Sequence, residues 1–141
     1  MMQPSLRIPS NPRYLRLVRM TVAEVGQLSG LSEDSIDEVM LGVDEACTNV
    51  IRHAYNNDFN GEIIIKFIDS DKIFEVIIED HGKKADPDSF ICKPLGEFRI
   101  GGYGLHLMRR AFKVLSYDQT TNDSNRLRML RNKKEYENNN R

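Results

Sequence analysis

Apolar residues recur at helical spacing along two stretches in the first part of the chain. The first starts near Arg13 and stops at Gly30; the second opens at Ser32 and ends in a turn-rich run at residues 56–58. Acidic residues directly after Ser32 favour a helix start, because they complement the positive end of the helix dipole. The two apolar stripes are Leu15, Val18, Val22, Val25 and Leu28, then Ile36, Val39, Met40, Val43, Ala46, Cys47, Val50 and Ala54. Both stretches are predicted to be helices that bury one face.

Residues 62–69 and 73–80 have a different pattern, since both are rich in β-branched residues and only a short polar turn separates them. They are predicted to form an antiparallel hairpin. The remaining expected elements are a short edge strand at 5–9, a helix at 103–112, and strands at 114–117 and 127–130. This order predicts an α+β fold, a two-layer sandwich in which helices cover one face of a mixed, mostly antiparallel sheet.

Residues 81–101 break every periodic pattern with glycines, prolines and lysines. A structureless stretch of roughly twenty residues is unusual in a compact domain, and such loops are often lids or binding loops. We expect one domain over residues 1–133, with a lid at about 83–100 and a polar tail at 134–141.

The amino-acid composition limits which kinds of molecule the chain is expected to bind. The 141 residues carry 20 basic and 21 acidic side chains, a net charge of −1, which gives no electrostatic support for direct binding to nucleic acid or a membrane. Cys47 and Cys92 have no disulfide-like spacing. The chain shows neither a signal-peptide pattern nor an apolar run long enough to span a membrane, so we expect a cytoplasmic protein.

The second helix places Glu45 and Asn49 four residues apart, on one helical face. A carboxylate base beside a neutral oxygen ligand suits metal-assisted phosphoryl or hydrolytic chemistry. The pair alone also fits an ordinary helix surface, where most glutamates lie.

Two later segments supply complementary chemistry. Asp80 and Gly82 follow an apolar strand, where a carboxylate can read the amino group of a base and a glycine permits a close turn. The run at 101–105, Gly-Gly-Tyr-Gly-Leu, leads into a helix whose first amides can cradle phosphate. Each segment alone also fits a simple turn. A P-loop is absent, and the dinucleotide fingerprint lacks its third glycine.

Together the three ordered motifs resemble the anti-sigma factor serine/threonine-protein kinases of the histidine-kinase-like ATPase superfamily, which has a Bergerat-type ATP-binding fold. The resemblance covers about residues 5–133 and rests on Glu45-Ala46-x-x-Asn49-x-x-x-His53-Ala54-Tyr55, Asp80-x-Gly82 and Gly101-Gly102-x-Gly104-Leu105. It implies the histidine-kinase-like ATPase fold, with ATP and Mg²⁺ as cofactors.

The resemblance also implies a role for each motif. Glu45 would be the general base that activates a serine hydroxyl, and Asn49 the Mg²⁺ ligand. Asp80 would bind the adenine amino group in a pocket shaped by Gly82. The remaining cofactor-binding positions would be Gly101, Gly102, Gly104 and Leu105.

The implied function is an anti-sigma regulatory kinase. It would phosphorylate a small anti-anti-sigma protein on serine, sequester a sigma factor, and act as a homodimer. An alternative is an ATP-binding partner-switch module that regulates by binding, without phosphoryl transfer. A catalytic piece of a two-component histidine kinase fits less well, because separate dimerisation helices with a phospho-accepting histidine are not seen. A structural domain without nucleotide is the fourth interpretation.

Some positions depart from the common family pattern. Lys83 and Lys84 stand early in the lid, where a further glycine or proline is frequent, and either lysine is a candidate phosphate contact. Residues 123–126, Asp-Ser-Asn-Arg, stand where many members have a Gly-Thr pair, which weakens any hydroxyl contact near adenine. His53 is expected to pack and orient its helix, and Arg19 is a candidate for the partner surface.

Overall fold

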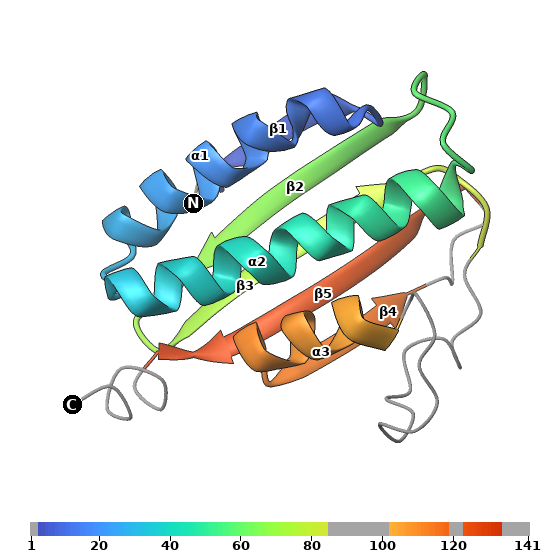
Figure 1. Cartoon of the computed structure of the whole chain (residues 1–141). Coiled ribbons are helices and arrows are strands. Elements are labelled where there is room, and N and C mark those ends of the chain that lie inside the picture. The colour runs from blue at the N-terminus through green and yellow to red at the C-terminus, as the bar shows by residue number, and fades with distance from the viewer. Residues whose placement is uncertain (1–2, 85–101, 119–122, 134–141) are drawn as a thin grey trace.

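The computed structural model describes residues 3–84, 102–118 and 123–133, with the backbone alone at 102–105. The described chain forms a sheet layer and a helix layer (Figure 1). The strands are β1 (Ser5–Pro9), β2 (Glu62–Asp69), β3 (Ile73–Asp80), β4 (Val114–Asp118) and β5 (Asn125–Asn132). The helices are α1 (Leu15–Leu28), α2 (Glu33–Asn49) and α3 (Gly102–Ala111), with a 3-10 turn at Pro12–Tyr14 and a π-helical turn at Val50–Ala54.

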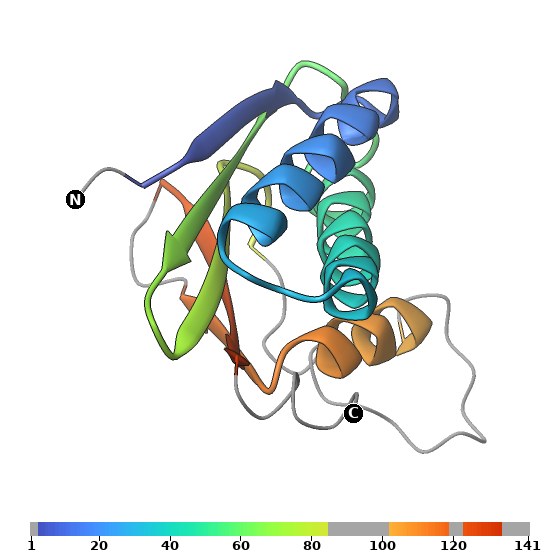
Figure 2. The same cartoon turned by 90° about the vertical axis from the view of Figure 1, so that its left-hand side faces the viewer.

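The described strands form one sheet in the order β1-β2-β3-β5-β4, and each of the four pairings is antiparallel. The helices lie together on one face, as the side view in Figure 2 shows. The predicted two-layer α+β sandwich is therefore confirmed, and the described strands contain only antiparallel pairs. The hairpin of β2 and β3 has the predicted bounds, whereas β5 starts two residues before the predicted strand and ends two residues after it.

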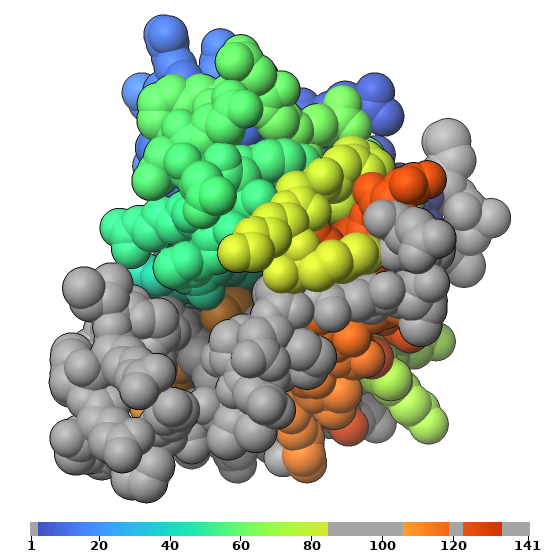
Figure 3. All heavy atoms as spheres, turned by 90° about the vertical axis from the view of Figure 1, so that its right-hand side faces the viewer, coloured from blue at the N-terminus to red at the C-terminus, as the bar shows by residue number. Residues whose placement is uncertain are grey.

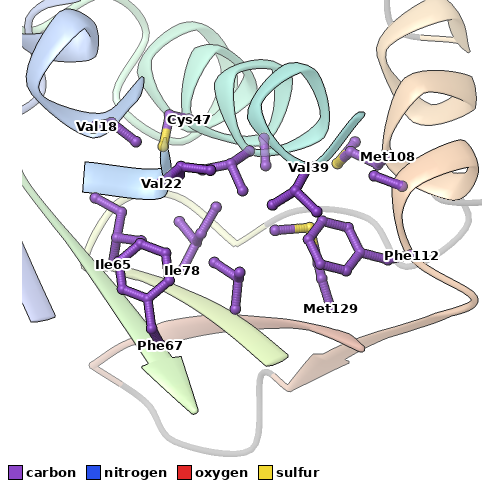
Figure 4. Packing of buried hydrophobic residues seen from close by; sticks show 14 of the residues in the cluster. Val18, Val22, Val39, Cys47, Ile65, Phe67, Ile78, Met108, Phe112 and Met129 are labelled. Carbon is purple, nitrogen blue, oxygen red and sulfur yellow. The ribbon is translucent and has the colours of Figure 1, made fainter. Parts of the chain in front are cut away.

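The hydrophobic core fills the space between the two layers. Figure 4 shows Val22 of α1 on the side of Ile65 and Ile78 of the sheet, and Val39 of α2 beside Phe112 and Met129. The aromatic residues Phe67, Phe74 and Phe112 are completely buried. Burial of a large apolar side chain contributes about 1.5–3 kcal/mol, so this layer contact is the main source of stability.

Cys47 belongs to this core, as predicted, and is fully buried. Burial, with a smaller contribution from Asp44, raises the pKa of its thiol well above the ordinary value. The thiol therefore stays protonated and unreactive. Cys92 lies outside the described residues.

Local sequence explains how the helices are placed. The side chain of Ser32 caps α2 by accepting a hydrogen bond from the backbone N–H of Ser35 at 3.2 Å, and acidic residues occupy the first turn. Gly42 lets α2 and α3 approach closely, since a Cβ there would lie 3.0 Å from the Cβ of Ala111. In Figure 1, α2 lies between α1 and α3, across the middle of the sheet.

A buried arginine connects the two layers. Arg131 on β5 is 1% exposed, and it donates hydrogen bonds to the Ser35 hydroxyl at 2.9 Å and to the Ala111 carbonyl at 3.1 Å. Its guanidinium also lies 3.7 Å from the Glu38 carboxylate. The sheet is thus fastened to α2 and α3 by polar contacts as well as by apolar packing.

Charged side chains cover the sheet face that the helices leave open. Glu79 pairs with Lys66 at 3.0 Å and with Arg126 at 2.8 Å, and Glu75 pairs with Arg128 at 2.9 Å.

Within the described residues, no helix combines the length and apolar character needed to cross a membrane.

Candidate functional site

Three parts of the chain that carry predicted site residues lie at one end of the sandwich, together with the start of β5, for which no site residue was predicted. The end of α2, the end of β3, the start of β5 and the first turn of α3 all lie toward the right of Figure 1. Figure 3 views this end, where the green atoms after α2 lie beside the yellow atoms of residues 80–84 and the red atoms at the start of β5. The fold therefore brings the separate sequence motifs into one region.

Glu45 and Asn49 occupy the final turns of α2, and both are partly exposed. Among the described residues, neither side chain has a hydrogen-bond or ion-pair partner. The neighbouring Asp44 differs, because its carboxylate accepts a hydrogen bond from Arg19 Nη1 at 2.8 Å. Glu45 is thus the carboxylate of this helical turn that stays available to a ligand. Arg19, the partner-surface candidate, forms an ion pair within the chain.

The helix widens directly after Asn49 into the π-helical turn Val50–Ala54, closed by a hydrogen bond from Tyr55 N–H to the Val50 carbonyl at 3.1 Å. Such turns are rare overall, and many of them occur at functional sites. His53 is exposed, so the expectation that it packs was wrong. In a regular helix, the side chain of His53 would lie on the same buried face as Ala46, but the wider turn directs it away from that face.

Tyr55 ties this turn to two strands. Its hydroxyl donates to the Glu62 carbonyl at 2.6 Å and accepts a hydrogen bond from His81 N–H at 2.8 Å. Burial raises the pKa of Tyr55, against the opposing effect of these backbone hydrogen bonds, so the hydroxyl stays protonated and able to donate. Tyr55 is the last residue of the sequence motif that starts at Glu45, but no role was predicted for it. Its position directly after Ala54 in that motif was the only sequence feature that pointed to a functional role.

Gly82 lies where β3 leaves the sheet and passes over the π-helical turn. A Cβ at this position would come 2.5 Å from the Ala54 carbonyl oxygen, and the next residue, Lys83, donates its N–H to that oxygen at 2.7 Å. The close turn expected at Gly82 is present. Its immediate contact is the end of the helix that carries Glu45 and Asn49.

Asp80 is 3% exposed at the end of β3. Its Oδ1 accepts hydrogen bonds from Gly82 N–H at 2.9 Å and from Asn125 Nδ2 at 2.7 Å. Its Oδ2 accepts no hydrogen bond from the described residues, and this oxygen is not fully buried. Oδ2 is therefore an accessible acceptor. Burial raises the pKa of this carboxyl, although both hydrogen bonds and the nearby His81 and Lys84 act in the opposite direction.

The segment after β3 is fastened to the start of β5. His81 Nδ1 lies 2.8 Å from the Asp123 carbonyl, and Lys84 Nζ donates to the Ser124 carbonyl at 2.6 Å. Lys84, which the sequence left as a candidate phosphate contact, thus anchors this segment in the structure. Asn125 was missed as a site residue, because the sequence showed only a departure from the Gly-Thr pattern.

The glycine-rich run is described in part. The helix α3 begins at Gly102, so Gly102, Gly104 and Leu105 lie in its first turn. The first amides of a helix have no intrahelical partner and suit an anion. Gly101 and residues 85–100 of the predicted lid lie outside the described residues.

Sequence comparison identifies the family. A model of the histidine kinase-like ATPase domain matches residues 8–131. The serine-protein kinase RsbW of Bacillus subtilis is 35% identical over 114 residues, covering 73% of this chain and 69% of the relative. The RsbW kinase of Oceanobacillus iheyensis is 32% identical over 111 residues, covering 73% and 70%. The chain belongs to the RsbW serine-protein kinase family.

Solved structures agree with this assignment at the level of the fold. A structure of the RsbU and RsbW domains of a Mycobacterium tuberculosis protein has a TM-score of 0.66 and 14% identity, covering 92% of this chain and 31% of that one. A blue-light activated histidine kinase domain from Erythrobacter litoralis has a TM-score of 0.57 and 16% identity, covering 92% and 64%. The RsbW family assignment confirms the resemblance, while the roles of individual residues remain predictions.

The residues present fit the ligands that RsbW membership implies. Asp80 offers an accessible acceptor for an amino group, and Asn49 offers a neutral oxygen for a hard cation. Within the described residues, no group of three or more His, Cys, Asp or Glu side chains is arranged to hold a metal ion.

Proposed function

We propose that the chain is an ATP-dependent serine/threonine-protein kinase that acts as an anti-sigma factor. It phosphorylates a small anti-anti-sigma protein on serine and sequesters a sigma factor. Family membership supports this reaction class. The observation that carries the proposal is that Glu45, without a partner among the described residues, shares one end of the fold with the accessible oxygen of Asp80.

The base and the phosphates are held by different segments. Asp80 Oδ2 accepts a hydrogen bond from the amino group of adenine, while Gly82 leaves room for the chain to pass close to Ala54. The first-turn amides of α3, at Gly102 and Gly104, face the phosphates, with Gly101 and Leu105 beside them in the sequence. ATP bound in this way supplies the phosphoryl group.

Asn49 is the proposed Mg²⁺ ligand. Its amide oxygen is a hard neutral donor four residues after Glu45 on the same helix. Bound Mg²⁺ would offset the negative charge of the phosphates. The protein's own contribution is to hold the amide at the end of α2, beside the π-helical turn.

Glu45 is the proposed general base. Its carboxylate accepts the proton of the substrate serine hydroxyl. The serine oxygen forms a bond to the γ-phosphorus of ATP while the bond from that phosphorus to the bridging oxygen breaks, and ADP leaves. Asp44, the adjacent carboxylate, is held by Arg19 and does not compete for this role. The chemistry therefore needs Glu45 in its ionised form with an unobstructed side chain.

We also propose a homodimer, on the strength of family resemblance, and the cytoplasmic location that is expected from the sequence. The sigma factor and the anti-anti-sigma protein are the proposed partners, with no direct nucleic-acid or membrane partner. Size-exclusion chromatography with light scattering tests the dimer, and a single species with the mass of a monomer would contradict it.

Two measurements test the function. Mg·ATP should raise the melting temperature, since a ligand that binds only the folded state stabilises it. Radiolabelled ATP should then transfer phosphate to a serine of the anti-anti-sigma protein. Binding without transfer, together with intact partner regulation in Glu45→Ala, would replace the kinase with the ATP-binding partner-switch module.

A further inference from the structure

Asn125 is the first residue of β5 and lies directly opposite Asp80, the last residue of β3. Along β5 the buried positions alternate with exposed ones, so Asn125 shares the helix-covered face with Leu127 and Met129. Its exposed fraction is 0%. A fully buried amide at the end of a sheet needs a reason, because polar groups are rarely buried without partners.

The orientation of this amide is fixed by its surroundings. Asn125 Nδ2 lies 2.7 Å from Asp80 Oδ1, 3.2 Å from the Gly82 carbonyl and 3.3 Å from the Lys83 carbonyl. A flipped amide would bring its own oxygen against three acceptors, so Nδ2 must face them. The amide oxygen Oδ1 therefore points elsewhere. It is completely buried and has no hydrogen-bond partner among the described residues.

The amide also decides which oxygen of Asp80 is available. Among the described residues, Gly82 and Asn125 donate to the Asp80 carboxylate, and both donors bind Oδ1. Two hydrogen bonds on one oxygen hold the carboxylate in one rotamer and leave Oδ2 as the accessible acceptor. An outward acceptor favours a purine with a 6-amino group and repels one with a 6-oxo group.

We propose that Asn125 sets the base specificity of the site, by clamping Asp80 Oδ1 so that Oδ2 faces the nucleotide. Asn125 is thus a positioning residue that acts through Asp80. This inference rests on the proposed nucleotide-binding function.

The experiment compares ATP and GTP binding to the full chain by calorimetry. Asn125→Ala is expected to weaken ATP binding about tenfold and to leave GTP binding nearly unchanged, because hydrogen bonds to charged groups contribute on this scale. Asn132→Ala is the matched control: Asn132 is an exposed residue of the same type at the other end of β5, and its loss should change neither affinity.

A pH profile separates positioning from simple structural loss. Loss of the Asn125 donor should move the midpoint of ATP binding to higher pH, since the ionised form of Asp80 loses a stabilising hydrogen bond. The other titratable groups acting near Asp80 are His81, Lys84 and Tyr55, and they are unchanged in the variant. A folded Asn125→Ala protein with an unchanged ATP-to-GTP ratio and an unchanged midpoint would overturn the inference.

Asn125→Thr covers the case in which the alanine variant does not fold. Threonine suits a strand and keeps a hydroxyl donor beside Asp80, so an intermediate ATP preference is expected. A folded threonine variant with an ATP-to-GTP affinity ratio below that of the wild-type chain would support the clamp, whereas one with the wild-type ratio would contradict a specific need for the amide. If the wild-type chain binds no ATP, the proposed function fails. If it binds both nucleotides equally, only this inference fails.

Discussion

Asn125 Nδ2 lies 2.7 Å from Asp80 Oδ1, across the pair of neighbouring strands β5 and β3. The contact joins residues 45 positions apart in the sequence and fixes the carboxylate at the end of β3. It makes the proposed base-reading group part of the sheet itself. Ligand recognition and the stability of the strand ends are therefore linked through Asp80.

Replacement of Asp80 by asparagine should separate binding from stability. Because burial raises the pKa of Asp80, its ionised form is unfavourable in the folded state, and Asp80→Asn should unfold at a temperature no lower than wild type. The variant should lose the melting-temperature increase produced by Mg·ATP. Asp71→Asn, at an exposed position of the β2–β3 turn, is the control and should keep that increase. A variant that still binds ATP would rule out Asp80 as the base-reading residue.

The raised pKa of Asp80 also predicts a pH dependence. Adenine recognition needs the ionised form, so ATP affinity should fall as the pH drops through a pKa above the ordinary value of 3.8. The contribution of Asp80 to the stability of the fold has the opposite pH dependence. A raised carboxyl pKa stabilises the folded protein at low pH, and this stability is lost as the pH rises. Titration calorimetry across the acid range checks the first effect. An affinity that stays constant down to the ordinary pKa would contradict it.

Tyr55→Phe should loosen the link between the π-helical turn and the two strands. The variant loses the hydroxyl that donates to Glu62 and accepts from His81, at a cost of about 1–2 kcal/mol in the free energy of unfolding. Urea denaturation measures this cost. Tyr14→Phe is the control, since the Tyr14 hydroxyl has no hydrogen-bond partner among the described residues. Equal stability of the two variants would show that the hydroxyl of Tyr55 contributes nothing.

Gly82→Ala should be harmful for steric reasons. The new Cβ would lie 2.5 Å from the Ala54 carbonyl oxygen, and relief of that clash should cost about 1–3 kcal/mol and weaken ATP binding. Gly30→Ala provides a comparison, because Gly30 has a φ of 82° and no atom lies within 4 Å of the position that a Cβ would take there. Only backbone strain of about 1 kcal/mol is expected for Gly30→Ala, with ATP binding unchanged. Normal ATP binding by a folded Gly82→Ala protein would contradict the need for close approach.

The sequence predicted those parts of the fold that depend on local pattern. The amphipathic stripe of α2, its Ser32 cap and the β2–β3 hairpin follow from residue spacing and turn chemistry, and all three are present. Glu45 and Asn49 were brought together by the same helical spacing. Their convergence with Asp80 came from family resemblance, since spacing alone does not place a helix against a strand end.

Other features depend on tertiary contacts and carry no local signal. The π-helical turn after Asn49 exposes His53, because one extra residue per turn changes the direction of the side chains. Arg131 reads as a surface charge in the sequence, yet partners on two helices allow it to be buried. Asn125 is similar: its role depends on lying opposite Asp80, a register that the strand pattern alone does not specify.

The central claim is that Glu45 removes the proton from a partner serine, and one comparison tests it most directly. Glu45→Gln and Asp44→Asn change adjacent carboxylates of α2 to their amides, but only Asp44 is already held by Arg19. Transfer of radiolabelled phosphate to the anti-anti-sigma protein should be lost in Glu45→Gln and kept in Asp44→Asn, with ATP binding intact in both. Full transfer by Glu45→Gln would contradict the account.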